Sequence, residues 1–166
     1  MQLAPLPANE RERMCAVFDL KILDTAGEDR FDRLTREATA RFKVPISTIT
    51  IVEGDREWFK SAIGLNQKQG PRDISFCGHA LLKEDIFIVE DTLQNPIFKD
   101  NPMVVGEPFI RFYAGKSLYK HGVNLPVGVF CIKDRVPRKM SLQDVNDFLA
   151  LAERVEDELN LPKPIE

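Results

Sequence analysis

A cysteine and a histidine stand two residues apart in the segment SFCGHALL. Cys77 could serve as a nucleophile with His79 as its base, or the two could form half of a zinc site. Ser75, however, is a suitable N-cap for a short helix here, and helical residues at i and i+2 point about 200° apart. The spacing therefore favours Cys77 as a small buried residue over a reactive one, and it leaves His79 free to contact a ligand.

A metal site would need further ligands, and His121 is the only other histidine in the sequence. The three cysteines, Cys15, Cys77 and Cys131, form no CxxC pair, which is typical of reduced thiols in a cytosol. We therefore expect a cytoplasmic protein without a metal site, and the sequence identifies no cofactor.

The length and composition indicate one globular domain. The chain has 166 residues, of which 43% are hydrophobic and 30% charged, and this is enough for a real core. Its net charge of −3, with lysine and arginine scattered among acids, argues against nucleic-acid binding. No apolar run approaches the roughly 20 residues that span a bilayer, and MQLAPLPANERER lacks the features of a signal peptide. We expect neither nucleic-acid binding nor membrane insertion.

Two helices are expected before the first strand. Asn9 is a candidate N-cap of the first helix, with Glu12 at the third position, and this helix should end by about Lys21. Thr25 and Glu28 form a capping-box pattern for the second helix. Apolar residues then recur at helical spacing: Phe31, Leu34, Ala38 and Phe42.

Strands follow, because the apolar period changes to two. In ISTITIV, the odd-numbered residues from 47 to 51 point to one face and the even-numbered residues from 48 to 52 to the other. The turn EGDRE joins this strand to an antiparallel neighbour over residues 58–63. The polar segment GLNQKQGPRD should be irregular because of its Gly and Pro content.

The second half of the chain contains more hairpin strands and a last helix. IFIVE is a compact strand, and residues 91–107, interrupted by Pro96 and Pro102, should form a lid or binding loop. PFIRFYAGKSLY and LPVGVFCIKD should pair across the turn at residues 120–124, and Ser141 with Asp144 indicates a capped helix start. Because hairpins dominate, we predict an α+β fold with a mostly antiparallel sheet.

Long segments of the chain are similar to one subgroup of bacterial GAF domains. They come in the family order and spacing: LDTAGEDRFDRLTREATARFKVPISTITIVEGDREWFKSAIGL, PRDISFCGHALL, FKDNPMVVGEPFIRFYAG and VGVFCIKDRVPR. The resemblance implies a six-stranded, mainly antiparallel sheet with helices on both faces, and a pocket between the sheet and a helix-and-loop layer. It also implies one domain over residues 1–166, with an N-terminal helical segment at 1–24, a core at 25–160 and a tail at 161–166.

GAF domains are typically regulatory. They bind small molecules such as cyclic nucleotides or tetrapyrroles, or serve as dimerising relays, usually before an output domain such as a histidine kinase or diguanylate cyclase. We expect no output domain within these 166 residues. The chain lacks the Asn-Lys-Phe-Asp-Glu signature of cyclic-nucleotide members, and Gly78 separates Cys77 from His79, unlike the arrangement in bilin-binding relatives. The cysteine-bearing segments of free methionine sulfoxide reductases are also missing, so the ligand's identity is not predicted.

The implied pocket suggests a set of ligand contacts. Phe76, Cys77 and His79 belong to the segment that the resemblance places over the pocket. Arg111 and Tyr113 share one face of a strand, where the guanidinium could hold an anionic ligand, although a structural ion pair with an acid is the alternative.

Trp58 and Asp100 are further candidates. Trp58, the only tryptophan, either edges the pocket or covers the sheet, and Asp100 either caps a turn or closes over a ligand. The last helix carries a broad apolar stripe, which packs on one core or leaves a second surface for a homodimer. The stripe contains Leu142, Val145, Phe148, Leu149, Leu151, Ala152, Val155 and Leu159.

Three functions fit these features. The main prediction is a regulatory or sensory domain without enzymatic activity, which binds a small molecule and signals through its terminal helices. The first alternative is a dimerisation or protein-interaction module whose pocket has collapsed, with Phe and Ile side chains in place of a ligand. The second is a thiol-dependent reductase, which requires two cysteines within disulfide range, about 4.4–6.8 Å between Cα atoms.

Overall fold

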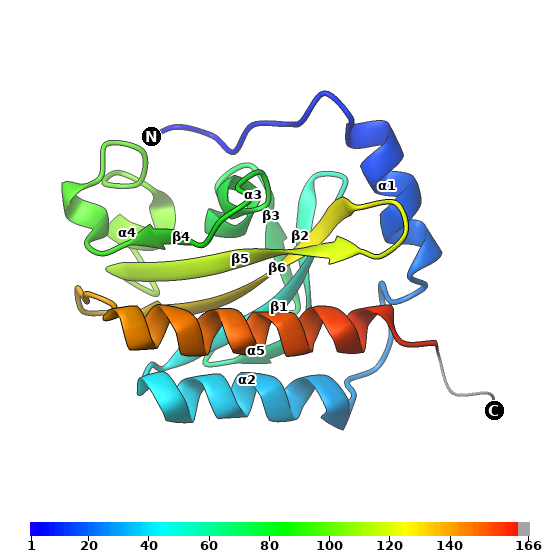
Figure 1. The fold of residues 1–166 in the computed structure, drawn as a ribbon. Helices are drawn as coiled ribbons and strands as arrows, with labels where there is room; N and C mark the ends of the chain where they lie inside the picture. The colour runs from blue at the N-terminus through cyan, green and yellow to red at the C-terminus, as the bar shows by residue number, and fades with distance from the viewer. Residues whose placement is uncertain (163–166) are drawn as a thin grey trace.

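The computed structural model describes residues 1–162, which form one six-stranded sheet with helices on both faces (Figure 1). The strand order is β3-β2-β1-β6-β5-β4, and every neighbouring pair is antiparallel. The strands are β1 Ile46–Glu53, β2 Arg56–Ile63, β3 Gln69–Pro71, β4 Phe87–Val89, β5 Phe112–Lys120 and β6 Leu125–Asp134. The helices are α1 Glu10–Asp19, α2 Asp29–Phe42, α3 Phe76–Ala80, α4 Pro102–Val105 and α5 Leu142–Asn160, with a 3-10 turn at Thr92–Gln94. The predicted α+β fold is confirmed.

The two faces of the sheet carry different layers. Figure 1 shows α2 and α5 side by side on one face, while α3 and α4 lie on the other and α1 packs on β1 and β6. None of the helices within residues 1–162 combines the length and apolar character needed to cross a bilayer. The predicted tail at 161–166 falls mostly outside the described residues.

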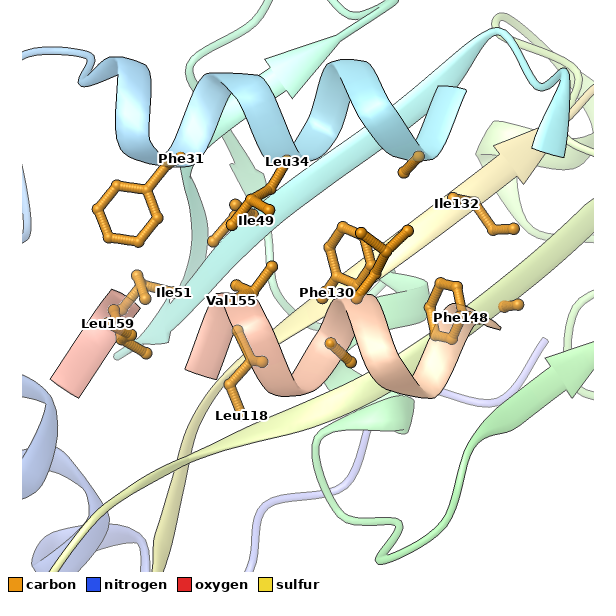
Figure 2. Packing of buried hydrophobic residues seen from close by; sticks show 14 of the residues in the cluster. Phe31, Leu34, Ile49, Ile51, Leu118, Phe130, Ile132, Phe148, Val155 and Leu159 are labelled. Carbon is orange, nitrogen blue, oxygen red and sulfur yellow. The ribbon is translucent and has the colours of Figure 1, made fainter. Parts of the chain in front are cut away.

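The core under α2 and α5 is apolar. Every second side chain of the central strands points toward these helices, and most of these side chains are hydrophobic. Ile49 and Ile51 of β1 and Phe130 of β6 lie here, with Phe148 of α5 stacked on Phe130 at 5.1 Å between ring centroids (Figure 2). The buried residues of α5 are Phe148, Leu151, Ala152, Val155 and Leu159. Most of the apolar stripe of α5 therefore packs on its own sheet, and the homodimer stays a prediction.

Local signals located some helix starts and missed others. Ser141 and Asp144 form the predicted capping box, and the Ser75 hydroxyl accepts a hydrogen bond from Gly78 N. Asn9 precedes α1, but its side chain makes no capping hydrogen bond. The capping box predicted at Thr25 is wrong, because the Thr25 hydroxyl bonds elsewhere and α2 begins only at Asp29.

Two segments expected to be irregular contain short regular elements. The polar segment after β2 forms β3, where Pro71 is tolerated because β3 is an edge strand. The long loop after β4 contains α4, which Pro102 begins, with the Asn101 side chain accepting a hydrogen bond from Met103 N. Both elements are too short for their local pattern to reveal them.

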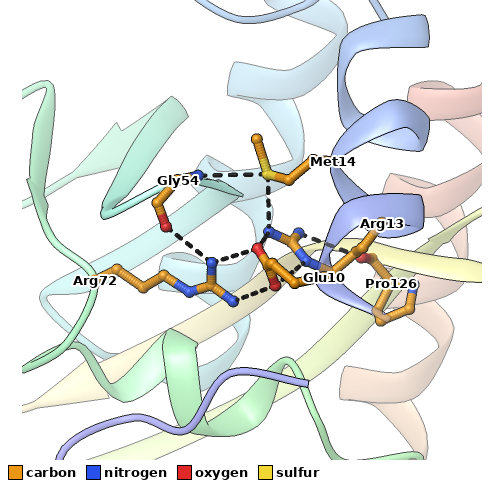
Figure 3. A network of polar contacts seen from close by, with 6 residues as sticks. All are labelled: Glu10, Arg13, Met14, Gly54, Arg72 and Pro126. Atoms are coloured by element: carbon orange, nitrogen blue, oxygen red, sulfur yellow. Dashed lines mark hydrogen bonds and ion pairs between the residues drawn. The ribbon is translucent and has the colours of Figure 1, made fainter. Parts of the chain in front are cut away.

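Glu10 fastens α1 to the rest of the fold (Figure 3). Its carboxylate accepts hydrogen bonds from Arg13, at 2.6 Å from Nη2 to Oε1, and from Arg72, at 2.6 Å from Nη1 to Oε1 and 3.0 Å from Nη2 to Oε2. Arg13 is fully buried and Arg72 is 3% exposed. Arg72 also donates to Gly54 O, and Arg13 to Pro126 O. Two buried guanidinium groups thus depend on one carboxylate.

We expect Glu10→Gln to destabilise the protein by about 3 kcal/mol near neutral pH, because it leaves buried arginines without a counter-charge. Burial alone would raise the pKa of Glu10, but the hydrogen bonds and charges of Arg72 and Arg13 outweigh it and lower the pKa to about 2. Since this value is below the usual 4.5, the contribution of Glu10 is complete above about pH 4.5 and is lost as the pH falls toward 2.

Urea unfolding across this pH range measures the effect. The free energy of unfolding of the wild type should fall more steeply between about pH 5 and pH 2 than that of Glu10→Gln. Glu12→Gln, an exposed change on the same helix, should follow the wild-type profile. If the free energy of unfolding fell equally steeply with pH in the wild type and in Glu10→Gln, the assigned role of the carboxylate would be contradicted.

Phe148→Ala should cost about 3–5 kcal/mol of unfolding free energy, because it removes a buried ring and leaves a cavity between α5 and the sheet. Phe148 is fully buried against Phe130 and meets Phe42 edge-on at 6.0 Å between centroids. Leu142→Ala is the control, since Leu142 is 77% exposed and its truncation should change stability by less than about 0.5 kcal/mol. Equal losses in the two variants would contradict the packing described.

Candidate functional site

Aromatic rings fill the space between the sheet and α3. Phe76 stacks on Phe98 at 4.4 Å and on Tyr113 at 5.2 Å between centroids, and the His79 ring meets Phe98 edge-on at 5.0 Å. Phe87 borders Phe98 and Tyr113 at 6.0 and 6.1 Å. Phe76, Phe98 and Tyr113 are fully buried. The protein's own side chains therefore occupy much of the place where the resemblance puts a ligand.

A chain of buried polar groups runs beneath these rings. The Tyr113 hydroxyl donates to Cys77 Sγ at 3.3 Å, and the Cys77 thiol donates to Thr50 Oγ1 at 3.8 Å. Thr50 Oγ1 lies 2.8 Å from Thr48 Oγ1, which lies 3.0 Å from Cys131 Sγ. Two of the three cysteines thus meet in one cluster inside the fold, while Cys15 is exposed on α1.

Strand alternation and one glycine position this chain. Thr48 and Thr50 have the parity of β1 that faces α3, and Cys131 of β6 lies opposite Thr48 in the ladder. Gly115 of β5 pairs with Cys131, and a Cβ at Gly115 would lie 2.3 Å from the Tyr113 hydroxyl oxygen. The missing side chain lets the Tyr113 ring lie along the strand, so that its hydroxyl reaches Cys77.

The two thiols differ in their ionisation. Burial disfavours the thiolate of Cys131, but the hydrogen bond from Cys77, the charge of Lys133 and the hydroxyl of Thr48 outweigh it and lower the pKa of Cys131 to about 7. The neighbouring Cys131 and burial raise the pKa of Cys77 well above its usual range. Burial, followed by the two cysteines, raises the pKa of Tyr113 in the same way. Cys131 is therefore the member of the pair that ionises first.

Two charged residues adjoin the cluster on the same face of the sheet. Lys133 follows Cys131 by two residues on β6 and is 2% exposed, and Glu57 of β2 is 4% exposed. Burial disfavours the ammonium of Lys133, but the charges of Cys131 and Glu57 outweigh it and raise its pKa. Burial raises the pKa of Glu57 more than Lys133 lowers it. Both side chains line a cavity beside the aromatic layer.

The N-terminal segment covers α3 and takes His79 as a partner. The Gln2 carbonyl lies 3.1 Å from His79 Nε2, and Ala4 N donates to Asp73 O at 2.8 Å. Gly78 permits this approach, because a Cβ there would lie 2.7 Å from Ala4 Cβ. Burial lowers the pKa of His79 despite the hydrogen bond to Gln2. His79 and Cys77 thus contact different partners, as their helical spacing predicted.

The remaining predicted contacts do not join this cluster. Arg111 donates to Val104 O at 2.8 Å and to Ile110 O at 3.3 Å, so backbone carbonyls take the place of the predicted acid or ligand. Asp100 pairs with the N-terminal ammonium at 2.6 Å on the surface. Trp58 packs in the core on the α2 and α5 face, so it covers the sheet instead of edging the α3 side. Of the seven candidates, the structure brings together Phe76, Cys77, His79 and Tyr113.

Sequence reasoning missed Cys131, Lys133 and Glu57 as members of this region. One signal was present, because Lys133 lies near the end of the apolar strand LPVGVFCIKD, on the same face as Cys131. A charge inside such a strand is unusual enough to mark a partner or a ligand. Its proximity to Glu57 follows only from the pairing of distant strands.

Comparison with known proteins places the chain among GAF-fold proteins. No family model matches the chain. The cyclic di-GMP phosphodiesterase PA2567 of Pseudomonas aeruginosa is 42% identical over 139 residues, which are 83% of this chain and 23% of that protein. The chain therefore spans about a quarter of the length of this relative.

Solved structures match 82–96% of the chain at lower identity. The GAF domain of an Acinetobacter phosphoenolpyruvate-protein phosphotransferase superposes with a TM-score of 0.63 and 14% identity, over 89% of this chain and 92% of that one. A domain of a Sinorhizobium meliloti sensor histidine kinase gives 0.63 and 17%, over 82% and 92%. The free methionine-R-sulfoxide reductase of Neisseria meningitidis, solved with its substrate, gives 0.63 and 16%, over 96% and 98%.

These relatives correct one prediction. The expectation of a protein without enzymatic activity is contradicted, because the 42% identical relative is named a phosphodiesterase and reductase structures share the fold. The sheet order, the layers on both faces and the structural likenesses confirm the fold expected from the sequence. This chain has the GAF fold.

Proposed function

We propose that this chain is a regulatory GAF module that controls the hydrolysis of cyclic di-GMP. The observation that carries the proposal is the 42% identity over 139 residues to a segment of a cyclic di-GMP phosphodiesterase. That segment is 23% of the relative, so control of catalytic groups elsewhere in the same protein is the role that fits it.

The packing of the sheet supports this role. The central strands β1 and β6 carry the aromatic and polar cluster under α3 on one face and the core under α5 on the other. A rearrangement beneath α3 would therefore press on the strands that hold α5. Regulation requires two such arrangements and a ligand or partner that favours one of them.

Exchange of the matched segment tests this proposal. Three proteins are compared: the Pseudomonas aeruginosa phosphodiesterase, the same protein without the matched segment, and a chimera that carries this chain in its place. We expect deletion to change the rate of cyclic di-GMP hydrolysis and the chimera to restore the parental rate to within about tenfold. Equal rates in all three proteins would contradict the proposal.

A thiol-dependent reductase is the second candidate, because Cys77 and Cys131 meet in the interior and the pKa of Cys131 is lowered to about 7. In such a reaction two thiols become a disulfide, the sulfoxide becomes a sulfide, and its oxygen leaves as water. Free methionine-R-sulfoxide reductases share the fold.

Turnover of free methionine sulfoxide, with dithiothreitol to reduce the disulfide again, distinguishes this candidate. Cys77→Ser and Cys131→Ser should each lower turnover by about two orders of magnitude or more, because each removes one of the two thiols that form the disulfide. Cys15→Ser is the control and should keep full turnover, because Cys15 is exposed on α1. A wild type without turnover, or thiol variants as active as the control, would eliminate this candidate.

A further inference from the structure

A cavity of about 280 Å³ opens between the edge of the sheet and α4. Its apolar walls come from Phe59 of β2, Leu65, Met103 of α4 and Ile110. Gln67, Gln69 and Glu107 add polar groups to its lining, and the side chains of Glu57 and Lys133 complete it. We name it the Glu57–Lys133 cavity. Its apolar walls and few charged groups are the usual composition of a small-molecule site.

Both charges of the cavity are buried without a complete set of partners. Glu57 Oε2 has no hydrogen-bond partner among the described residues, whereas a hydrogen bond from Ser75 to the Glu57 carboxyl group lowers the pKa that burial raises. No carboxylate of residues 1–162 lies within 4.0 Å of Lys133 Nζ, and no hydrogen bond from it reaches these residues; it lies 5.8 and 5.9 Å from the ring centroids of Phe76 and Tyr113. Buried charges are normally paired, because the protein interior does not replace their lost hydration.

The two charges do not satisfy each other. Glu57 and Lys133 interact electrostatically, because the charge of Glu57 raises the pKa of Lys133. They nevertheless form no ion pair. A purely structural pair would close this gap and complete its hydrogen bonds. The space that separates them suits a group that offers a positive charge to Glu57 and a negative charge to Lys133.

We propose that the Glu57–Lys133 cavity binds a free amino acid with an apolar side chain, which acts as an effector of the regulatory module. The ligand ammonium would donate to Glu57 Oε2, its carboxylate would accept from Lys133 Nζ, and its side chain would lie against Met103 and Ile110. The inference rests on the regulatory role proposed above and adds the class of ligand to it.

The dimensions of the cavity support this class over larger ligands. A volume of about 280 Å³ lies just below the range for small-molecule pockets, which is roughly 300–1,000 Å³. Phe76, Phe98 and Tyr113 close the adjoining space with stacked rings. A cyclic dinucleotide or a tetrapyrrole therefore has no room here, whereas an amino acid does.

Calorimetric titration of the wild-type protein tests the charge pattern without any substitution. L-leucine, L-isoleucine, L-valine, L-methionine and L-phenylalanine are titrated first. The amino acid that binds best is then compared with two analogues that each lack one charge, which for leucine are 3-methylbutan-1-amine and 4-methylpentanoate. We expect each analogue to bind at least about tenfold more weakly, because each leaves one buried charge unpaired. Absence of binding by all five amino acids, or analogues as tight as the parent, would overturn the proposal.

Two variants test the residues themselves. Glu57→Gln and Lys133→Met should each weaken binding at least about tenfold. Each ligand-free variant should also melt at or above the wild-type temperature, because the substitution removes a buried charge that lacks a partner. A merely structural role would instead lower the melting temperature. Variants that melt as predicted but bind like the wild type would contradict the site.

Lys60→Met is the matched control. Lys60 is also a buried lysine, but its Nζ pairs with Glu28 Oε2 at 2.7 Å, and Lys60 is not among the residues of the Glu57–Lys133 cavity. This variant should lose stability and keep the affinity for the amino acid. The exchange of segments described above tests regulation separately. A chimera that restores the parental rate while no amino acid binds would overturn only the ligand, not the regulatory role.

Discussion

The pairing of β1 with β6 in the middle of the sheet is the constraint on which the rest of the structure depends. Both strands are covered on both faces, so the parity of each residue decides which layer it enters. Ile49, Ile51 and Phe130 enter the apolar core under α2 and α5, whereas Thr50 and Cys131 enter the layer under α3. A slip of one residue would exchange the two sets and bury polar groups in the apolar core.

The polar residues on the α3 face explain why this layer differs from an ordinary core. Thr48 and Thr50 cannot reach water, so they bond to each other and to the cysteines. This network holds α3 in place from below, while the N-terminal segment holds it from above through His79. The layer under α3 is thus enclosed by the protein's own chain. Its packing is therefore sensitive to a ligand bound in the adjoining cavity.

Stability and function make opposite demands at the edge of this layer. Glu10 shows how the fold treats buried charge where stability matters, because its carboxylate accepts hydrogen bonds from Arg13 and from Arg72, whose Nε alone is left without a partner. Glu57 and Lys133 differ, since both residues are buried without forming an ion pair among residues 1–162, and Glu57 Oε2 has no hydrogen-bond partner there. A buried carboxylate oxygen without a partner, on a cavity that Lys133 also lines, is the physical reason to regard the second pair as a place for a ligand.

The sequence by itself determined the fold and the longer elements, because apolar periodicity, caps such as Ser75 and Ser141, and the two main hairpins are local properties of the chain. It also grouped seven candidate contacts, of which Phe76, Cys77, His79 and Tyr113 lie together under α3, whereas Trp58, Arg111 and Asp100 lie elsewhere. Only the tertiary structure decided that rings fill the space under α3, that Cys77 meets Cys131, and that Glu57 and Lys133 share a cavity. These contacts join strands far apart in the chain, and side-chain packing between such strands leaves no local pattern.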